Sequence, residues 1–393
     1  MADYSVIIVS LKLKTLRIIA LLILSFLLGT VDPVFSSDTG SSGYSALREY
    51  LLKYRDIAKR GGWPAVTKGP SLRKGDRSER VTALRRRLTA TEDISSRAAA
   101  DEFLFDEELH NAVIRFQKRH GLIIDGVAGK ETVRMLNVPV EKRIFQMEIN
   151  LERFRDIKDL GDRYICINIA DFELKVIEHG NSVMNMKVIV GKQYWNSPLF
   201  SSQLTHVVFN PSWYVPTSIA IEEILPKIKE KPDYLSKESI KVFSKEKNRL
   251  KEINTASINW ADVTAENFRY KLVQVPGIKN PLGKLKFLFP NEYFVYLHDT
   301  PAKVLFEKSS RAFSHGCIRI EKPVELAEYL FRDDPSWTPE RISAMIERGK
   351  EVKVPLPAPV TIHILYLTTW VDEENVLQFR DDIYSRDIRG GKL

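Results

Sequence analysis

Between residues 72 and 137 the hydrophobic positions recur at the spacing of an α-helix. Asp106 is a good N-cap residue for the second of these helices, because acidic side chains follow it. That helix should end at His120 and Gly121, since glycine is favoured just past a helix. The pattern predicts a three-helix module, with apolar positions at Val81, Leu84 and Leu88, then Ala112, Val113 and Phe116, then Thr132, Val133 and Leu136.

From about residue 163 the pattern changes to short apolar or β-branched runs separated by turn sequences, which predicts an antiparallel, mostly-β domain. Residues 211–275 interrupt it with helix-like, Lys- and Glu-rich segments. An insertion of that size usually forms a lid or a binding wall. Residues 323–331 predict an amphipathic helix that begins at a proline. The predicted strands are 164–169, 173–178, 184–190, 205–209, 285–289 and 293–298, followed by a hairpin of 360–371 and 376–379.

The N-terminus has a different pattern. Basic residues precede an apolar run, 18–28, that only Ser25 interrupts, and Gly29 to Pro33 would break a helix. This order is typical of a secretory signal peptide, with an uncleaved membrane anchor or a buried helix as alternatives. In the first two cases the basic end stays in the cytoplasm and the rest of the chain is exported.

Composition changes this picture mainly through charge. The 393 residues are 44% hydrophobic and 28% charged, which is ordinary for a globular protein of two or three domains. The net charge of +8 would suit nucleic acid, anionic lipid or another anionic polymer. Export argues against nucleic acid as a partner. The run Arg85 to Arg87 points in several directions on a helix, which favours a solvated face.

The candidate chemistry gathers around Cys317, in the sequence Phe-Ser-His-Gly-Cys-Ile-Arg-Ile. A cysteine attacks as the thiolate, so it needs a nearby base or positive charge. His298, at a predicted strand end, could take the thiol proton and later give it to a leaving amine, while His315 could line the pocket. Gly316 would let a carbonyl approach, and the N–H groups of Gly316 and Cys317 could stabilise an oxyanion. Arg319 could hold a carboxylate of the substrate or of the protein.

Three other interpretations compete with a nucleophile. A lone cysteine is often a buried structural residue. A disulfide to Cys166 would remove the useful thiol, and Cys166 lies in a run that indicates a buried strand. Cys317, His315, His298 and Asp299 are zinc-ligand types, but no Cys-x-x-Cys or His-Glu-x-x-His motif accompanies them. The local composition favours the nucleophile, with no metal and no cofactor.

Two resemblances to known families follow from these motifs. Residues 72–138 resemble the three-helix peptidoglycan-binding-like domain, which implies glycan recognition. Residues 163–385 resemble the L,D-transpeptidase catalytic domain of the YkuD type, in its larger Gram-negative branch. The motifs are Leu72, Gly75-Asp76, Phe105, Gln117, Leu122, Asp125-Gly126 and Gly129 for the first, and Val190-Gly191-Lys192, Val207 to Pro211, Trp213 to Pro216, Lys286 to Asn291, Tyr296 to Pro301 and Arg311 to Arg319 for the second.

The second resemblance implies a fold and a set of roles. The fold is an α+β multidomain one: a mostly-β catalytic domain with an inserted helical capping subdomain, preceded by the three-helix domain. Cys317 would be the nucleophile and His298 the proton donor and acceptor. Oxyanion and pocket residues would be Gly316, His315, Ser314, Arg319 and Tyr296, and the candidates for the substrate cleft are Trp213 and Tyr214.

The resemblance also implies a reaction. Cys317 would attack a peptidoglycan stem peptide after its third residue, expel the terminal D-alanine, and pass the acyl group to an amine of a second stem peptide, forming 3,3-crosslinks in the periplasm. Carbapenems would acylate the same thiol. Lipoprotein attachment and D-amino acid exchange are alternative transfers. An L,D-carboxypeptidase or endopeptidase, and a non-catalytic peptidoglycan-binding protein, are alternative functions.

These inferences predict six segments. They are a signal peptide or inner-membrane anchor at 1–36, a linker and helical scaffold segment at 37–71, the peptidoglycan-binding-like domain at 72–138, a connecting helix at 139–162, the catalytic domain at 163–345 with its capping insertion at about 215–275, and a C-terminal hairpin that completes the scaffold at 346–393.

Overall fold

The computed structural model describes residues 42–94, 99–157, 160–246 and 249–388. The predicted signal or anchor segment, 1–36, lies outside these residues. Contacts divide the chain into two units, 1–42 and 43–393, and the elements described below belong to the second apart from the first residue of one helix. In the part of the chain that the structure describes, no helix is both long enough and apolar enough to span a membrane.

The predicted three-helix module is confirmed. It consists of α3 (Glu79–Thr89), α4 (Glu107–Arg119) and α5 (Lys130–Leu136). The Asp106 carboxylate accepts the backbone N–H of Leu109 at 2.9 Å, as expected of an N-cap. The predicted position Thr132 is buried but polar, and its hydroxyl accepts from the Gln117 side-chain amide at 3.2 Å. The other predicted positions build the core together with further residues, among them Val81, Leu84, Leu88, Phe105, Leu109, Ala112, Val113, Phe116, Val133 and Leu136.

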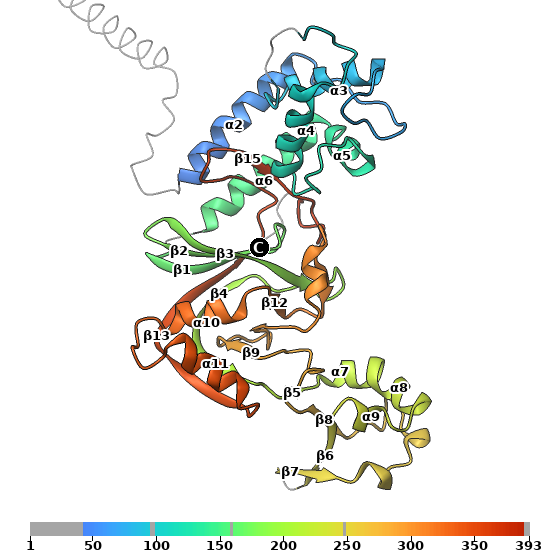
Figure 1. Ribbon diagram of the computed structural model, residues 1–393, viewed down its shortest axis with the longest axis vertical. Helices are drawn as coiled ribbons and strands as arrows, with labels where there is room; N and C mark the ends of the chain where they lie inside the picture. The colour runs from blue at the N-terminus through green and yellow to red at the C-terminus, as the bar shows by residue number, and fades with distance from the viewer. Residues whose placement is uncertain (1–41, 95–98, 158–159, 247–248, 389–393) are drawn as a thin grey trace, which may run out of the picture. The chain divides into compact units, whose positions relative to one another are not determined.

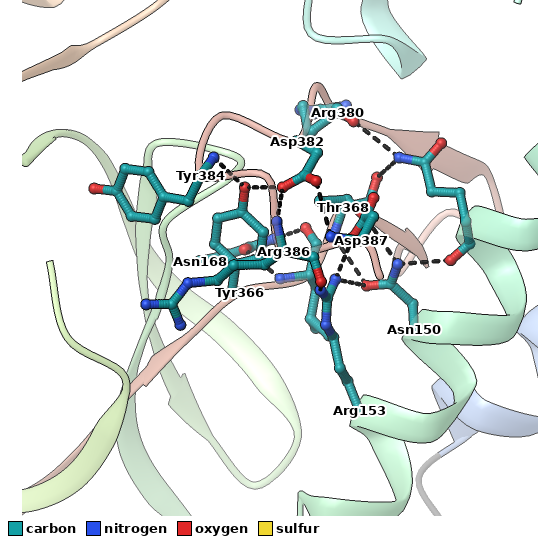
Figure 2. Close-up of polar contacts among 12 residues, drawn as sticks. Asn150, Arg153, Asn168, Tyr366, Thr368, Arg380, Asp382, Tyr384, Arg386 and Asp387 are labelled. Atoms are coloured by element: carbon teal, nitrogen blue, oxygen red, sulfur yellow. Dashed lines mark hydrogen bonds and ion pairs between the residues drawn. The ribbon is translucent and has the colours of Figure 1, made fainter. Parts of the chain in front are cut away.

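A second core joins three segments that are far apart in the sequence. Helices α2 (Ser42–Lys59) and α6 (Val140–Asp156) pack with the hairpin of β14 (Thr369–Val371) and β15 (Leu377–Phe379). Buried polar groups fasten α6 to the C-terminal segment, as Figure 2 shows. The Asn150 side-chain amide donates to Thr368 Oγ1 at 2.8 Å, and the Thr368 N–H donates to Asn150 Oδ1 at 2.9 Å.

The mostly-β domain is a closed sheet. Nine of the described strands follow the order β11-β3-β12-β10-β9-β4-β13-β1-β2, and β2 also pairs with β3, so the sheet closes into a barrel. The strands are β1 (Arg163–Asn168), β2 (Glu173–Glu178), β3 (Asn181–Gly191), β4 (Phe200–Phe209), β9 (Leu285–Leu288), β10 (Leu297–His298), β11 (Ala312–Ser314), β12 (Ile318–Ile320) and β13 (Val352–Leu365).

The sheet is mixed, whereas the sequence predicted an antiparallel one. Three pairs are parallel: β1 with β13, β10 with β12, and β11 with β3. Strands joined by short turns pair antiparallel, as predicted, but parallel partners need longer connections, and their pairing leaves no local pattern. One of these parallel pairs carries the candidate site. Outside the sheet, α10 (Pro323–Phe331) is the helix predicted to begin at a proline, and α11 (Pro339–Glu347) and the 3₁₀ segment η4 (Lys303–Glu307) were not predicted.

The C-terminal part contributes more than the predicted hairpin. Strand β13 lies between β4 and β1 in the barrel (Figure 1), so the mostly-β domain extends past residue 345 to Leu365. Only the end of the predicted first hairpin strand, β14, pairs with β15. The prolines at 355, 357 and 359 obscured β13, because proline cannot donate to a ladder, and the register shifts between Pro355 and Val360.

The insertion has a core of its own, and we call residues 213–274 the cap. It contains the expected helices and also a four-stranded sheet, β5-β8-β6-β7, that the sequence did not predict. Its elements are β5 (Trp213–Tyr214), α7 (Thr217–Ile219), the π-helical turn η1 (Ala220–Ile224), α8 (Leu225–Glu230), α9 (Tyr234–Lys237), β6 (Ile240–Glu246), β7 (Arg249–Ile253), the 3₁₀ turns η2 (Thr255–Ser257) and η3 (Trp260–Asp262), and β8 (Lys271–Gln274).

Candidate active site

The pairing of neighbouring strands brings His298 beside the end of the segment 314–317, which we call the cysteine loop. In the parallel pair β10–β12, Leu297 lies opposite Ile318, and His298 lies opposite Arg319. Leu297 and Ile318 belong to the barrel core, so the alternate residues His298 and Arg319 occupy the other face. Cys317 lies two residues before Arg319, just ahead of β12. The predicted nucleophile and base are therefore brought to one face of the sheet from neighbouring strands.

The same register adds Lys286 to the site, a residue that the sequence motifs did not indicate as part of it. Lys286 on β9 lies directly opposite His298, so three basic residues form a transverse row across β9, β10 and β12. Lys286 Nζ lies 3.7 Å from the centre of the Tyr296 ring. Alternation along a predicted strand could have placed Lys286 on one face, but only the pairing register places it beside His298. We call Lys286, His298 and Arg319 the basic row.

The turn before Cys317 is held by its own side chains. Gly316 has φ of +111°, a conformation that side-chain-bearing residues rarely adopt. The Ser314 hydroxyl donates to the Cys317 carbonyl at 2.5 Å and accepts the Gly316 N–H at 3.1 Å. The Gly316 N–H is therefore occupied. Of the two N–H groups predicted to meet an oxyanion, that of Cys317 is the one that donates no hydrogen bond within the described residues.

Hydrogen bonds of Ser197 and Tyr384 stabilise this turn further. Ser197 Oγ donates to the Gly316 carbonyl at 2.8 Å and accepts the Gly191 N–H at 3.0 Å. The Tyr384 hydroxyl in turn donates to the Gly191 carbonyl at 2.7 Å and accepts the Ser197 N–H at 3.2 Å. Ser197 and Tyr384 carried no recognisable signal in the sequence, since they meet Gly316 only through long-range folding.

The main influence on the pKa of the Cys317 thiol is its burial. Burial raises the pKa of Cys317, while the backbone N–H and hydroxyl of Tyr296 and the charges of Lys286 and Arg319 oppose that rise. Burial, and after it the contact with the thiol, raises the pKa of the Tyr296 hydroxyl. The resting site at neutral pH therefore holds a protonated thiol, which needs a base for attack.

His298 is suited to be that base. Its Nδ1 lies 2.5 Å from the Asp299 carbonyl, which can only accept, so Nδ1 carries the proton of the neutral ring and Nε2 carries the lone pair. Burial lowers the pKa of His298 to about 3, and the positive charges of Arg319 and Lys286 act in the same direction. Backbone hydrogen bonds to Asp299 and Pro281 oppose this lowering of the pKa. The imidazole is therefore neutral at neutral pH, and in this structure it is a weak base. None of the hydrogen bonds among the described residues joins His298 to Cys317, so His298 on β10 and Cys317 just ahead of β12 share a face of the sheet but are not hydrogen-bonded in this structure.

Matches to family models agree with this geometry. Residues 162–354 match the family described as L,D-transpeptidase catalytic domain, and residues 77–136 match the one described as "Putative peptidoglycan binding domain". The chain carries an L,D-transpeptidase catalytic domain. The three-helix module is its peptidoglycan-binding-type domain.

Curated relatives share parts of the chain. A Haemophilus influenzae protein named "Putative L,D-transpeptidase" is 31% identical over 242 residues, which cover 62% of this chain and 48% of that protein. An N-acetylmuramoyl-L-alanine amidase of Mycobacterium tuberculosis is 40% identical over 80 residues, or 19% of this chain and 20% of the amidase. The chain thus spans about half of the first relative and a fifth of the second. The solved L,D-transpeptidase of Stackebrandtia nassauensis aligns over 77% of this chain and 96% of its own, at 14% identity and a TM-score of 0.27.

In this transpeptidase domain His315 faces the cap. Its Nε2 lies 2.8 Å from the Glu223 carboxylate on η1, and its ring lies 4.2 Å from that of Trp195. His315 thus joins the cysteine loop to the cap. The other predicted cleft residues lie on β5, where Trp213 packs against the cap core and Tyr214 is exposed.

The remaining candidates have structural surroundings. Asp299 Oδ2 accepts the Lys284 N–H at 2.8 Å and Oδ1 pairs with Lys303 at 2.8 Å, so the carboxylate braces the strand end that carries His298. Both cysteines are free, and burial raises the pKa of Cys166 to about 12. Among the described residues, no group of three or more His, Cys, Asp or Glu side chains is arranged to hold a metal ion.

Proposed function

We propose that the protein is a peptidoglycan L,D-transpeptidase that works through an acyl-enzyme on Cys317. The observation that carries the proposal is the pairing of β10 with β12, which puts a buried, neutral His298 on the same face as Cys317. The Asp299 carbonyl supports the base by holding Nδ1–H, so that Nε2 can accept a proton. The family match of residues 162–354 supports the reaction class.

The reaction would proceed in two transfers. His298 takes the Cys317 proton as Sγ attacks the carbonyl carbon of the third stem residue. The Cys317 N–H stabilises the oxyanion. The amide C–N bond then breaks, and the leaving D-alanine amine takes the proton from His298 and leaves a thioester. In the second transfer His298 removes a proton from an acceptor amine, which attacks the thioester. The new amide forms, and Cys317 regains its proton.

The substrates and the site of action extend this proposal. Donor and acceptor are stem peptides of peptidoglycan, which the match of residues 77–136 to a peptidoglycan-binding domain supports. The thiol would also be acylated by carbapenems, which present a strained carbonyl to the same nucleophile. The basic and apolar pattern of residues 12–28 supports action in the periplasm.

Product analysis tests the proposal. Purified disaccharide-tetrapeptide is incubated with the protein, and the products are identified by mass spectrometry. We expect crosslinked dimers that have lost one D-alanine. Tripeptide without dimers would identify a carboxypeptidase instead, and unchanged tetrapeptide together with binding to sacculi would identify a non-catalytic wall-binding protein.

A further inference from the structure

The Arg319 guanidinium, next to the cysteine loop, has no hydrogen-bond or ion-pair partner in the described part of the chain. Its Nε is buried and lacks a hydrogen-bond partner, and no ion pair or hydrogen bond to its other nitrogens occurs among the described residues. Burial lowers the pKa of Arg319, and the charge of a Cys317 thiolate acts against this effect. An unpaired, largely buried cation is costly, so such a group indicates a missing anion.

Other buried arginines of this chain are satisfied by carboxylates or by neutral acceptors. Arg87 donates to the Leu136 carbonyl at 2.6 Å, and Arg143 donates to Gln146 Oε1 at 2.8 Å. Arg119 pairs with Asp93 at 2.5 Å, Arg153 with Asp387 at 2.7 Å, and Arg380 with Asp171 at 2.5 Å. Each of these pairs fastens one segment to another. Arg319 differs because its guanidinium has neither kind of partner among the described residues, and because it lies beside a predicted nucleophile.

Lys286, on the other side of His298 in the basic row, is a second partly buried cation of this kind. It is half-buried, its Nζ lies against the Tyr296 ring, and among the described residues it forms no ion pair. Burial lowers the pKa of Lys286, and Cys317 and Glu351 oppose this effect. The Glu351 carboxylate accepts the Ser212 N–H at 3.0 Å, so part of its hydrogen-bonding capacity is already used.

The basic row also constrains the chemistry of His298. If His298 takes the Cys317 proton, three positive charges lie side by side across β9, β10 and β12. The thiolate balances one of them. A further anion in the row would favour the protonated imidazole and so strengthen His298 as a base.

We propose that Arg319 and Lys286 form a carboxylate-binding site that takes the C-terminal carboxylate of the donor peptide. This inference rests on the proposed function. Cys317 and Arg319 are two residues apart on one face, about 7 Å along an extended strand. A carboxylate one residue beyond the attacked carbonyl lies about 3.6 Å from it along an extended peptide, and the long Arg319 side chain spans the remainder. The site therefore selects a donor with one residue after the attacked carbonyl and then a free carboxylate. Arginine and lysine are the usual partners of such a group.

The test compares two donors and four proteins. The donors are the stem tetrapeptide and the same peptide with a C-terminal carboxamide, and the rate of acylation of Cys317 is followed by intact-protein mass spectrometry. The wild type should be acylated by the acid at least tenfold faster than by the amide. Arg319→Gln and Lys286→Met should slow acylation by both donors, because both charges favour the thiolate, but should lose more rate on the acid than on the amide, so that the preference falls toward one. Lys353→Met should keep the wild-type preference, because Lys353 lies two strands beyond Lys286 in the same transverse row.

Equal acylation of acid and amide by the wild type would overturn the inference, and so would equal losses of Arg319→Gln on both donors. A third donor, amidated instead on a side-chain carboxylate of the stem peptide, should behave like the acid. If amidation of the side-chain carboxylate slowed acylation and amidation of the C-terminus did not, the site would bind the side-chain carboxylate and not the C-terminal one.

A binding measurement separates this inference from the proposed function. N-acetyl-D-alanine should slow alkylation of Cys317 by iodoacetamide in the wild type, and its amide should not. Arg319→Lys should retain part of the protection and Arg319→Gln should lose it. Protection without any acylation by tetrapeptide would contradict the transpeptidase proposal and support the site. Acylation by tetrapeptide without any preference for the acid over the amide would support the transpeptidase proposal and contradict the carboxylate-binding site.

Discussion

Ser197 Oγ donates a hydrogen bond to the Gly316 carbonyl at 2.8 Å, across 119 positions of the sequence. The same oxygen accepts the Gly191 N–H, and the Tyr384 hydroxyl contacts both Gly191 and Ser197. Tyr384 is itself tied to Tyr366, whose hydroxyl accepts the Tyr384 N–H at 2.9 Å and donates to Asp382 (Figure 2). The turn that carries Cys317 is therefore positioned by the β3–β4 loop and by the C-terminal segment.

Removing the Ser197 hydroxyl should loosen that turn. Ser197→Ala leaves the buried Gly191 N–H and the Gly316 carbonyl without their partner, which costs about 1–3 kcal/mol in the free energy of unfolding. We expect acylation by tetrapeptide to fall about tenfold or more. Urea denaturation and intact-protein mass spectrometry measure the two effects. Ser202→Ala, which removes an exposed hydroxyl bonded to the Pro290 carbonyl, is the matched control, and equal effects of both substitutions would contradict this role of Ser197.

The reactivity of Cys317 should follow a raised pKa. Because burial keeps the thiol protonated, the rate of iodoacetamide alkylation should still be rising above pH 9, the ordinary range of a cysteine. Lys286→Met removes a charge that favours the thiolate, so the alkylation profile should move to still higher pH. Lys353→Met should leave it in place. A plateau already reached near pH 7 in the wild type would mean that the resting site holds a thiolate.

Acid should destabilise the fold through His298. Burial gives His298 a pKa of about 3 in the folded protein, against about 6.5 in an unfolded chain. Between these values the unfolded chain binds a proton that the folded one does not, so the free energy of unfolding falls as pH drops below 6.5, by about 1.4 kcal/mol per pH unit. His120, whose pKa is also lowered by burial, acts in the same direction.

Urea denaturation at pH 7.5 and pH 5.0 measures this effect. The difference in free energy between the two pH values should be about 2 kcal/mol smaller in His298→Gln than in the wild type. His179→Gln, at an exposed histidine, should match the wild type. An unchanged difference in His298→Gln would show that the native protein binds the proton as readily as the unfolded chain.

The contact between His315 and Glu223 should steady the cap. The pair lies partly in solvent, so Glu223→Gln should change the free energy of unfolding by less than about 1 kcal/mol. Hydrogen–deuterium exchange of residues 217–230 should nevertheless become faster, because one link between η1 and the cysteine loop is weakened. Glu222→Gln, on the same turn but exposed, is the control. Unchanged exchange in Glu223→Gln would show that other contacts hold the cap.

Local patterns predicted the parts of the fold that local forces determine. The helices α3, α4 and α5 followed from apolar spacing and an N-cap, and β1 to β4 from short apolar runs between turns. The cap sheet was missed, because β6 and β7 are rich in lysine and glutamate, which are good helix formers. Tertiary pairing overrides that preference in exposed strands.

In the candidate site, too, local sequence patterns reveal some residues, and only the folded structure reveals the others. Cys317 and its neighbours form one contiguous motif, and His298 ends a predicted strand, so both could be found in the sequence. Lys286 joins His298 only through the register of β9 against β10. Ser197, Tyr384 and Glu223 reach the cysteine loop across long sequence separations. No local pattern encodes such contacts.

The central claim is that Cys317 carries the acyl group. Intact-protein mass spectrometry of the full chain after mixing with stem tetrapeptide tests it most directly, with Cys317→Ala and Cys166→Ala as the paired variants. We predict an adduct equal to the peptide minus its terminal alanine on the wild type and on Cys166→Ala, and none on Cys317→Ala. An adduct that persists on Cys317→Ala would contradict the account.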